Sequence, residues 1–165
     1  MQHVLVVDDE RDSAESMAML VSDAGFTVST ARTLVDARRQ IAMHKPDLVF
    51  LDLMLPDGSG MTLFEEHALP DDTEVVLVTG HGDVESSVRA LRLGAADYLL
   101  KPVSVQQLNE LLARVGKSAS RSAVAPADAP RRNRLLGRSP AMRRVVEQID
   151  RVAPTSVTVP RSEAR

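Results

Sequence analysis

Four short, nearly continuous apolar runs constrain this chain more than any other feature of its sequence. They are residues 4–7, 48–51, 75–78 and 98–100. Runs of this length are typical of strands buried on both faces, as in a parallel sheet that is covered by helices on each side. A weaker run over residues 26–30 follows Gly25 and adds a fifth candidate strand. We therefore expect five parallel strands.

The segments between these runs have the spacing of amphipathic helices. Apolar residues recur on one helical face within residues 14–21, 34–41 and 84–91, and a last helix is expected over residues 105–115. Candidate N-caps, two of them with a capping-box partner three positions later, are Thr33 with Asp36, Ser104 with Gln107, and Asp83 alone. Five strand–helix units with short connections predict a doubly wound α/β fold with helices on both faces of the sheet.

Polar residues follow the apolar runs at the points where the strands should end. In a parallel sheet these ends lie at one edge, and ligands bind there, where the winding direction switches. We therefore expect one small surface to collect Asp8, Asp9, Asp52, Thr79 and Lys101.

The types of these residues indicate phosphoryl chemistry. Three carboxylates held close together repel one another, and a divalent cation relieves that repulsion. Mg²⁺ suits such a site because it binds few carboxylates, retains water and accepts phosphate oxygens as ligands. A carboxylate such as Asp52 can also act as a nucleophile toward phosphorus, while Lys101 and Thr79 can stabilise the phosphoryl oxygens.

Four motifs make the chain recognisable over residues 1–117. They are Asp-Asp-Glu at 8–10, Asp-Leu-Met-Leu-Pro-Asp-Gly-Ser-Gly-Met at 52–61, Thr-Gly-His-Gly-Asp at 79–83 and Tyr-Leu-Leu-Lys-Pro at 98–102. In this order and spacing they resemble the receiver domains of two-component response regulators. The resemblance implies a flavodoxin-like sheet with strand order 2-1-3-4-5. It also implies a phosphoacceptor signalling domain rather than an enzyme, with a sensor histidine kinase as phosphoryl donor.

The resemblance also implies a role for each motif residue. Asp52 is similar to the phosphoacceptor of the family. Asp9 and Asp52 would bind Mg²⁺ directly, together with the backbone carbonyl of Met54, and Asp8 would act through water.

The remaining roles concern the phosphoryl group and the conformational change. Lys101 would pair with the phosphoryl group, and its peptide bond to Pro102 would be cis. Thr79 and Tyr98 would form the switch pair, in which Thr79 moves toward the phosphoryl group and the ring of Tyr98 fills the vacated space.

Other interpretations stay open for the motif residues. Asp8 and Asp9 could cap a helix, and Tyr98 could be an ordinary core residue. An aspartyl-phosphate phosphatase of related fold is the alternative function. That class generally has a second carboxylate two residues after its nucleophile, where this chain has Met54.

Charge divides the chain into two regions. Residues 1–115 hold 9 Lys and Arg against 19 Asp and Glu, a balance of -10, whereas residues 116–165 hold 11 against 4, a balance of +7. We expect a receiver domain over residues 1–117 and a flexible linker over residues 118–134. Residues 135–165 resemble the beginning of the ATPase domain in the NtrC branch of sigma-54-dependent activators. No G-x-x-x-x-G-K-[ST] nucleotide loop and no DNA-binding module follow in this chain.

Two further expectations concern location and assembly. The chain has no Cys, no signal-like start and no apolar run near the ~18 residues that span a bilayer, so we expect a cytoplasmic protein without membrane contact. By analogy with the family, a homodimer would form through the fourth helix, fifth strand and fifth helix.

Overall fold

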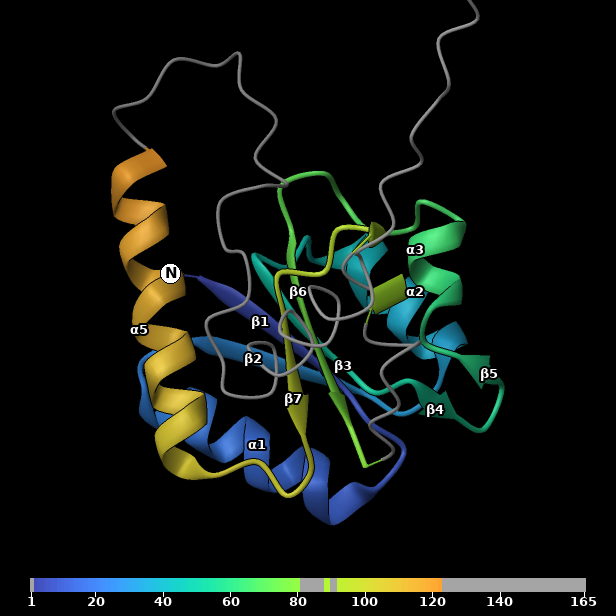
Figure 1. Ribbon diagram of the computed structural model, residues 1–165, viewed down its shortest axis with the longest axis horizontal. Helices are drawn as coiled ribbons and strands as arrows, with labels where there is room; N and C mark the ends of the chain where they lie inside the picture. Colours follow the sequence, from blue (N-terminus) through green and yellow to red (C-terminus); the bar gives the residue numbers. More distant parts are fainter. Residues whose placement is uncertain (1, 81–87, 90–91, 123–165) are drawn as a thin grey trace, which may run out of the picture.

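A five-stranded parallel sheet forms the centre of the computed structural model, which describes residues 2–80, 88–89 and 92–122 (Figure 1). Its strands run in the order β2-β1-β3-β6-β7, and every neighbouring pair is parallel. Their bounds are β1 His3–Val7, β2 Thr27–Ala31, β3 Leu48–Leu51, β6 Glu74–Thr79 and β7 Asp97–Leu100. Counted among the five sheet strands alone, this order is 2-1-3-4-5, so the predicted fold class is confirmed.

Helices cover both faces of this sheet (Figure 1). On one face, α1 (Arg11–Asp23) and α5 (Val105–Ser122) pack against Val4 and Val6 of β1. On the other face, α2 (Leu34–Met43) and α3 (Thr62–Glu65) pack against Leu5 and Val7. Successive residues of a strand point to opposite faces, so burial on both sides requires the continuous apolar runs seen in the sequence.

The structure differs from the sequence prediction at two places in the strands. The weak second strand begins at Thr27 and ends at Ala31, and as an edge strand it is only partly buried, which explains its weaker apolar pattern. A small antiparallel hairpin, β4 (Met54–Leu55) and β5 (Gly58–Ser59), was not predicted. It follows Asp52 directly and therefore shapes the loop at the end of β3.

Two of the predicted helix caps are present. The Thr33 hydroxyl accepts a hydrogen bond from the Asp36 amide at 3.1 Å. At the start of α5, the Ser104 hydroxyl accepts from the Gln107 amide at 3.2 Å and the Gln107 side chain accepts from the Ser104 amide at 3.1 Å. Asp83 and most of the expected fourth helix lie outside the described residues.

The last helix is longer than the sequence suggested. It was expected to end at residue 115, but α5 continues to Ser122, so residues 118–122 of the predicted linker are helical. Ala, Lys and Arg are among the best helix formers, and Ala119, Lys117 and Arg121 allow the helix to continue past Gly116. The rest of the predicted linker and the predicted ATPase start, residues 123–165, lie outside the described part of the chain.

Candidate functional site

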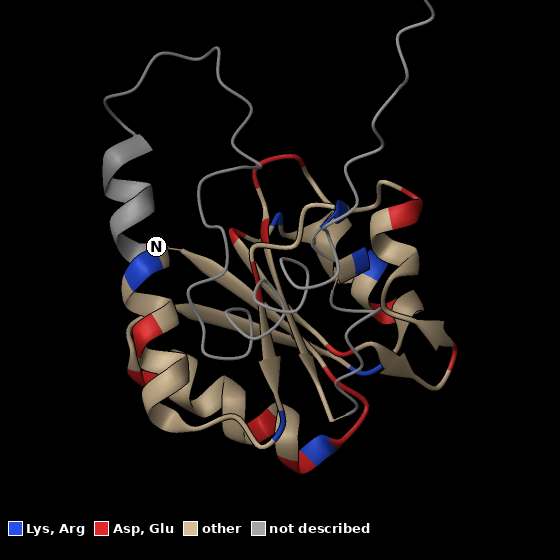
Figure 2. Ribbon diagram, viewed as in Figure 1, with Lys and Arg blue, Asp and Glu red and all other residues tan. Residues whose placement is uncertain are grey.

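The polar residues that follow the strands meet at the carboxyl edge of the sheet, as predicted. Asp8 follows β1, Asp52 follows β3, Thr79 ends β6, and Lys101 follows β7. Since β1, β3, β6 and β7 are consecutive neighbours in the sheet, their ends lie side by side. Acidic residues also mark the loop between β1 and α1 in Figure 2.

Lys101 joins the two buried carboxylates of this site. Its ammonium nitrogen lies 2.6 Å from Oδ2 of Asp52 and 2.7 Å from Oδ2 of Asp8. Burial lowers the pKa of Lys101, but hydrogen bonds to Asp52 and Asp8 and the charges of both carboxylates outweigh it, so the pKa stands above its ordinary value. The ammonium is therefore charged at neutral pH. The peptide bond from Lys101 to Pro102 is cis, as the family resemblance implied.

Both carboxylates also accept hydrogen bonds from nearby groups. Asp8 accepts hydrogen bonds from the Ser13 hydroxyl at 2.7 Å and from the Glu10 amide at 3.0 Å. Asp52 accepts one from the Met54 amide at 3.0 Å. The N-cap of α1 is Glu10, which makes no side-chain capping bond. Asp8 is therefore held at the site and does not occupy the N-cap position itself.

Three carboxylates of the site can supply oxygens to one cation. Asp8, Asp9 and Asp52 each offer one oxygen, and these oxygens lie within 4.8 Å of one another; Asp8 and Asp52 are buried and Asp9 is exposed. Three carboxylates and the Lys101 ammonium together carry a charge of about -2 when all are ionised. An oxygen-only ligand set with this charge fits a hard divalent cation.

Thr79 and Tyr98 lie on adjacent strands near the site. Thr79 is 1% exposed at the end of β6, and its carbonyl accepts a hydrogen bond from the Lys101 amide at 3.0 Å. Tyr98 is 2% exposed, is paired in register with Leu77, and belongs to the core on the α2 and α3 face. This position is compatible with an ordinary core residue, and the switching role of the pair stays a prediction.

Two residues near the site escaped the sequence analysis. The Asp57 carboxylate accepts hydrogen bonds from the amides of Leu34 at 2.8 Å and Val35 at 3.0 Å. These bonds, led by that from Leu34, hold the pKa of Asp57 below its ordinary value. The Arg32 guanidinium donates to the backbone carbonyl of Asp9 at 3.1 and 3.3 Å. An Asp-Gly pair signals a turn, but nothing in the sequence names a partner 23 positions away.

Glycines shape the loop that carries Asp52. Gly58 has a φ of 144°, which side-chain-bearing residues rarely adopt, and a Cβ at Gly60 would collide with the carbonyl oxygen of Asp52. The backbone of this loop therefore requires glycine at both positions.

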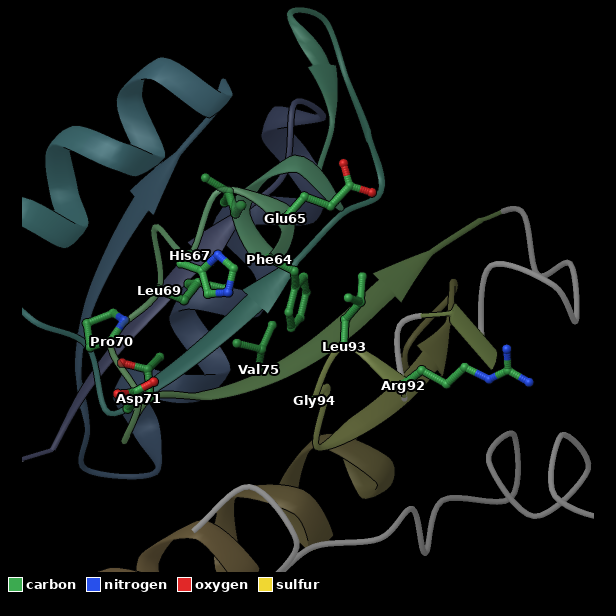
Figure 3. A pocket seen from close by; sticks show the side chains of 12 residues that line it. Phe64, Glu65, His67, Leu69, Pro70, Asp71, Val75, Arg92, Leu93 and Gly94 are labelled. Atoms are coloured by element: carbon green, nitrogen blue, oxygen red, sulfur yellow. The ribbon is translucent and has the colours of Figure 1, made fainter. Parts of the chain in front are cut away.

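A pocket of about 350 Å³ lies away from this site (Figure 3). It lies between α3 with the loop that follows it and residues 92–94, and Phe64, Val75 and Leu93 supply apolar lining. Neither the acidic residues at the strand ends nor Lys101 line it. Within the described residues, the candidate site thus shares no lining residue with this pocket.

Comparisons with known proteins agree with this geometry. Residues 4–113 match the family model of the response regulator receiver domain. The response regulator protein PilR of Pseudomonas aeruginosa is 36% identical over 160 residues, which cover 96% of this chain and 35% of PilR. The chain thus spans about a third of the length of the curated relatives that it matches first.

Solved structures give the same result. The receiver domain of NtrX from Brucella abortus is 35% identical with a TM-score of 0.64, and the match covers 70% of this chain and 98% of that domain. The beryllofluoride-activated NtrC4 receiver domain dimer is 32% identical with a TM-score of 0.66, over 72% of this chain and 98% of that one. The predicted resemblance to the NtrC branch agrees with these similarities. The chain belongs to the family of response regulator receiver domains of two-component systems.

Proposed function

We propose that Asp52 is the residue that accepts the phosphoryl group, and that a sensor histidine kinase is the donor. The observation that carries this proposal is the position of Asp52: a buried carboxylate at the end of β3, held by Lys101 and next to Asp8 and Asp9. In the transfer, an Asp52 oxygen forms a bond to phosphorus while the bond from phosphorus to the donor imidazole breaks, and the imidazole keeps the electron pair.

Asp8, Asp9, Asp52 and the backbone carbonyl of Met54 would hold Mg²⁺ in this proposal. When bound, the cation supplies positive charge to the phosphoryl oxygens. Asp52 is the nucleophile, and Lys101 places an ammonium beside it from the end of β7, where it can pair with a phosphoryl oxygen. The Thr79 hydroxyl would donate to another phosphoryl oxygen, and Tyr98 would respond to that movement as its switch partner.

Phosphorylation with a small-molecule donor tests the role of Asp52. The chain is incubated with acetyl phosphate and Mg²⁺, and its intact mass and the released phosphate are measured. We expect a stable gain of one phosphoryl group that the Asp52→Asn variant does not show. Continuous release of phosphate without a stable adduct would instead support the alternative, an aspartyl-phosphate phosphatase. The position of Met54, where that class has a carboxylate, disfavours it.

Calorimetric titration with Mg²⁺ tests the metal site separately. We expect Asp9→Ala to abolish measurable Mg²⁺ binding while the fold remains, since the substitution removes an exposed carboxylate and relieves repulsion. Unchanged Mg²⁺ affinity in this variant would refute the proposed ligand set.

The switch is tested by amide NMR shifts between Thr79 and Tyr98, with and without beryllofluoride as a phosphoryl mimic. Lys101→Ala should still be phosphorylated on Asp52 but should not show the full pattern of shifts, because the ammonium no longer holds the phosphoryl oxygens. The full wild-type pattern in this variant would exclude Lys101 as the coupling residue.

The output of the protein is proposed from its relatives. The match to PilR covers 96% of this chain and therefore includes residues beyond the receiver, in agreement with a linker and an ATPase start over residues 135–165. We infer that the receiver controls a sigma-54 activator in the cytoplasm. A homodimer through the expected fourth helix, β7 and α5 is proposed from the NtrC4 receiver dimer. Within the described residues, no helix is long and apolar enough to cross a membrane.

A further inference from the structure

The first turn of α2 is bonded to residues from outside the helix. The first amides of a helix have no partner within it and need other acceptors. The Thr33 hydroxyl accepts from the Asp36 amide, whereas the amides of Leu34 and Val35 donate to the Asp57 carboxylate. Three amides of this turn are thus satisfied by two side chains, one local and one distant.

The distant side chain ties α2 to the loop that follows the phosphoacceptor. Asp57 lies in the turn between β4 and β5, and Met54 stands at the start of that hairpin. The other end of the loop is fixed at Gly60, whose amide donates to the Leu53 carbonyl at 3.0 Å. Asp57 therefore holds the free end of the hairpin that contains the proposed Met54 carbonyl ligand.

A second contact ties the same region of α2 to the loop of Asp9. Arg32 stands just before the N-cap Thr33, and its guanidinium donates two hydrogen bonds to the Asp9 carbonyl. The side chain of Asp9 is exposed, so burial does not fix its loop. The segment from Arg32 to Val35 thus contacts both loops that carry proposed metal ligands.

We propose that Arg32 and Asp57 are positioning residues of the metal site, which hold the Asp9 loop and the Met54 hairpin in place through the first turn of α2. This inference rests on the proposed function, in which Asp8, Asp9, Asp52 and the Met54 carbonyl hold Mg²⁺. Mg²⁺ demands nearly ideal octahedral geometry, so displacement of either loop weakens binding. Loss of outer partners of metal ligands typically lowers metal affinity about 10- to 100-fold.

Charge and position predict opposite results for Arg32. Removal of a positive charge close to a cation site strengthens cation binding if only electrostatics matters. Removal of a group that holds Asp9 weakens it. For Asp57, the loss of its negative charge and the loss of its hydrogen bonds both weaken Mg²⁺ binding. Asp57→Asn separates the two effects because the amide oxygen can still accept a hydrogen bond after the charge is gone.

The experiment is a Mg²⁺ titration of the 165-residue chain by calorimetry, with urea unfolding of each variant in the absence of Mg²⁺. Thr33→Ala is the matched control, because it removes a cap from the same turn of α2 but touches neither loop. We expect Arg32→Ala and Asp57→Ala each to weaken Mg²⁺ binding on the order of tenfold. Thr33→Ala should lower the midpoint of urea unfolding, but its Mg²⁺ affinity should remain within about twofold of that of the wild-type chain. Asp57→Asn should bind more tightly than Asp57→Ala.

Several outcomes would overturn this inference. One is Mg²⁺ binding by Arg32→Ala that is unchanged or tighter. Another is an equal loss of Mg²⁺ affinity in Asp57→Asn and Asp57→Ala. The third is a loss of Mg²⁺ affinity in Thr33→Ala as large as in Arg32→Ala and Asp57→Ala. If Asp57→Ala does not fold, the Mg²⁺ titration of Arg32→Ala, a substitution at an exposed residue, still tests the inference. A wild-type chain that binds no Mg²⁺, or an Asp9→Ala variant that binds normally, overturns the proposed function as well. If Asp9→Ala loses Mg²⁺ binding as expected but Arg32→Ala and Asp57→Ala keep the wild-type affinity, only the positioning role is overturned.

Discussion

Two groups of charges, each with at least one buried aspartate, lie at opposite edges of the same sheet. At the carboxyl edge, Asp8 and Asp52 both contact Lys101. At the amino edge, Asp97 begins β7 and pairs with Arg114 of α5 at 2.7 Å, and Glu74 begins β6 beside the same arginine. Each group thus places two carboxylates around one cationic side chain.

The two groups differ in what they enclose. The amino-edge group surrounds a cavity of about 10 Å³, at the lower limit for a single water molecule, and Val76, Leu111 and Val115 also line it. The carboxyl-edge group adds the exposed carboxylate of Asp9. Burial raises the pKa of Glu74 in the first group, whereas the second group has a third carboxylate and is the proposed cation site. We infer that the first group attaches α5 to the sheet, and we propose that the second binds the cation.

The largest expected effect is at the amino edge. Arg114→Ala removes the guanidinium that pairs with the Asp97 side chain, which is 3% exposed. Removal of one member of a buried ion pair should lower the free energy of unfolding by about 3 kcal/mol. Urea unfolding measures this loss, and Mg²⁺ affinity should not change. A comparable loss of Mg²⁺ binding would show that the two groups are not independent.

A smaller and Mg²⁺-dependent effect is expected at the carboxyl edge. Lys101→Ala removes the cation between Asp8 and Asp52, but the hydrogen bonds that these carboxylates accept from the Ser13 hydroxyl and from the amides of Glu10 and Met54 remain. Without Mg²⁺ the free energy of unfolding should fall by about 2 kcal/mol, and saturating Mg²⁺ should recover part of this loss. Urea unfolding with and without Mg²⁺ gives both values. An equal loss in the two conditions would contradict the assignment of a cation site.

The third prediction concerns pH. Burial raises the pKa of Glu74 above its ordinary value of 4.5, although Arg114 partly opposes the shift. The folded state therefore binds the Glu74 proton more tightly than the unfolded state. The stabilisation from this proton is complete below the ordinary pKa and is lost as pH rises through the raised folded pKa.

Glu74→Gln removes the charge of this partly buried carboxylate and should increase the free energy of unfolding at pH 7, where the wild-type carboxylate loses the stabilisation described above. The part of the pH dependence above the ordinary pKa should disappear with it. Urea unfolding of both proteins from pH 4 to pH 8 checks the slope. The free energy of unfolding of the wild-type protein could instead rise from pH 4 to pH 8, with this rise absent from Glu74→Gln. That result would contradict the direction of the pKa shift that burial predicts.

The smallest effect is expected for an exposed ion pair. Lys45 contacts Asp72 at 2.6 Å, and their side chains are 58% and 44% exposed. Lys45→Ala should change the free energy of unfolding by less than about 0.5 kcal/mol, since solvent and salt screen such pairs. A loss as large as that of Arg114→Ala would show that burial does not account for the difference between these pairs.

The site could be predicted from the sequence because its residues follow strands that are each recognisable from an apolar run. Asp52 and Lys101 each end an apolar run, and topology then brings them together. The contacts of Asp57 and Arg32 depend on the path of two loops and on backbone acceptors, which have no sequence pattern. The β4–β5 hairpin was missed because two-residue strands leave no periodicity. The end of α5 was misplaced because a Gly interrupts an otherwise helical composition.

The side chain of Met54 has a practical consequence for spectroscopy. It is 65% exposed and stands two residues after Asp52, while its amide is bonded to that carboxylate. The chain contains no Cys and no Trp. A Met54→Cys substitution would therefore provide a unique attachment point for a fluorophore beside Asp52, outside the hydrophobic core. Such a label would allow phosphorylation and metal binding to be followed in real time.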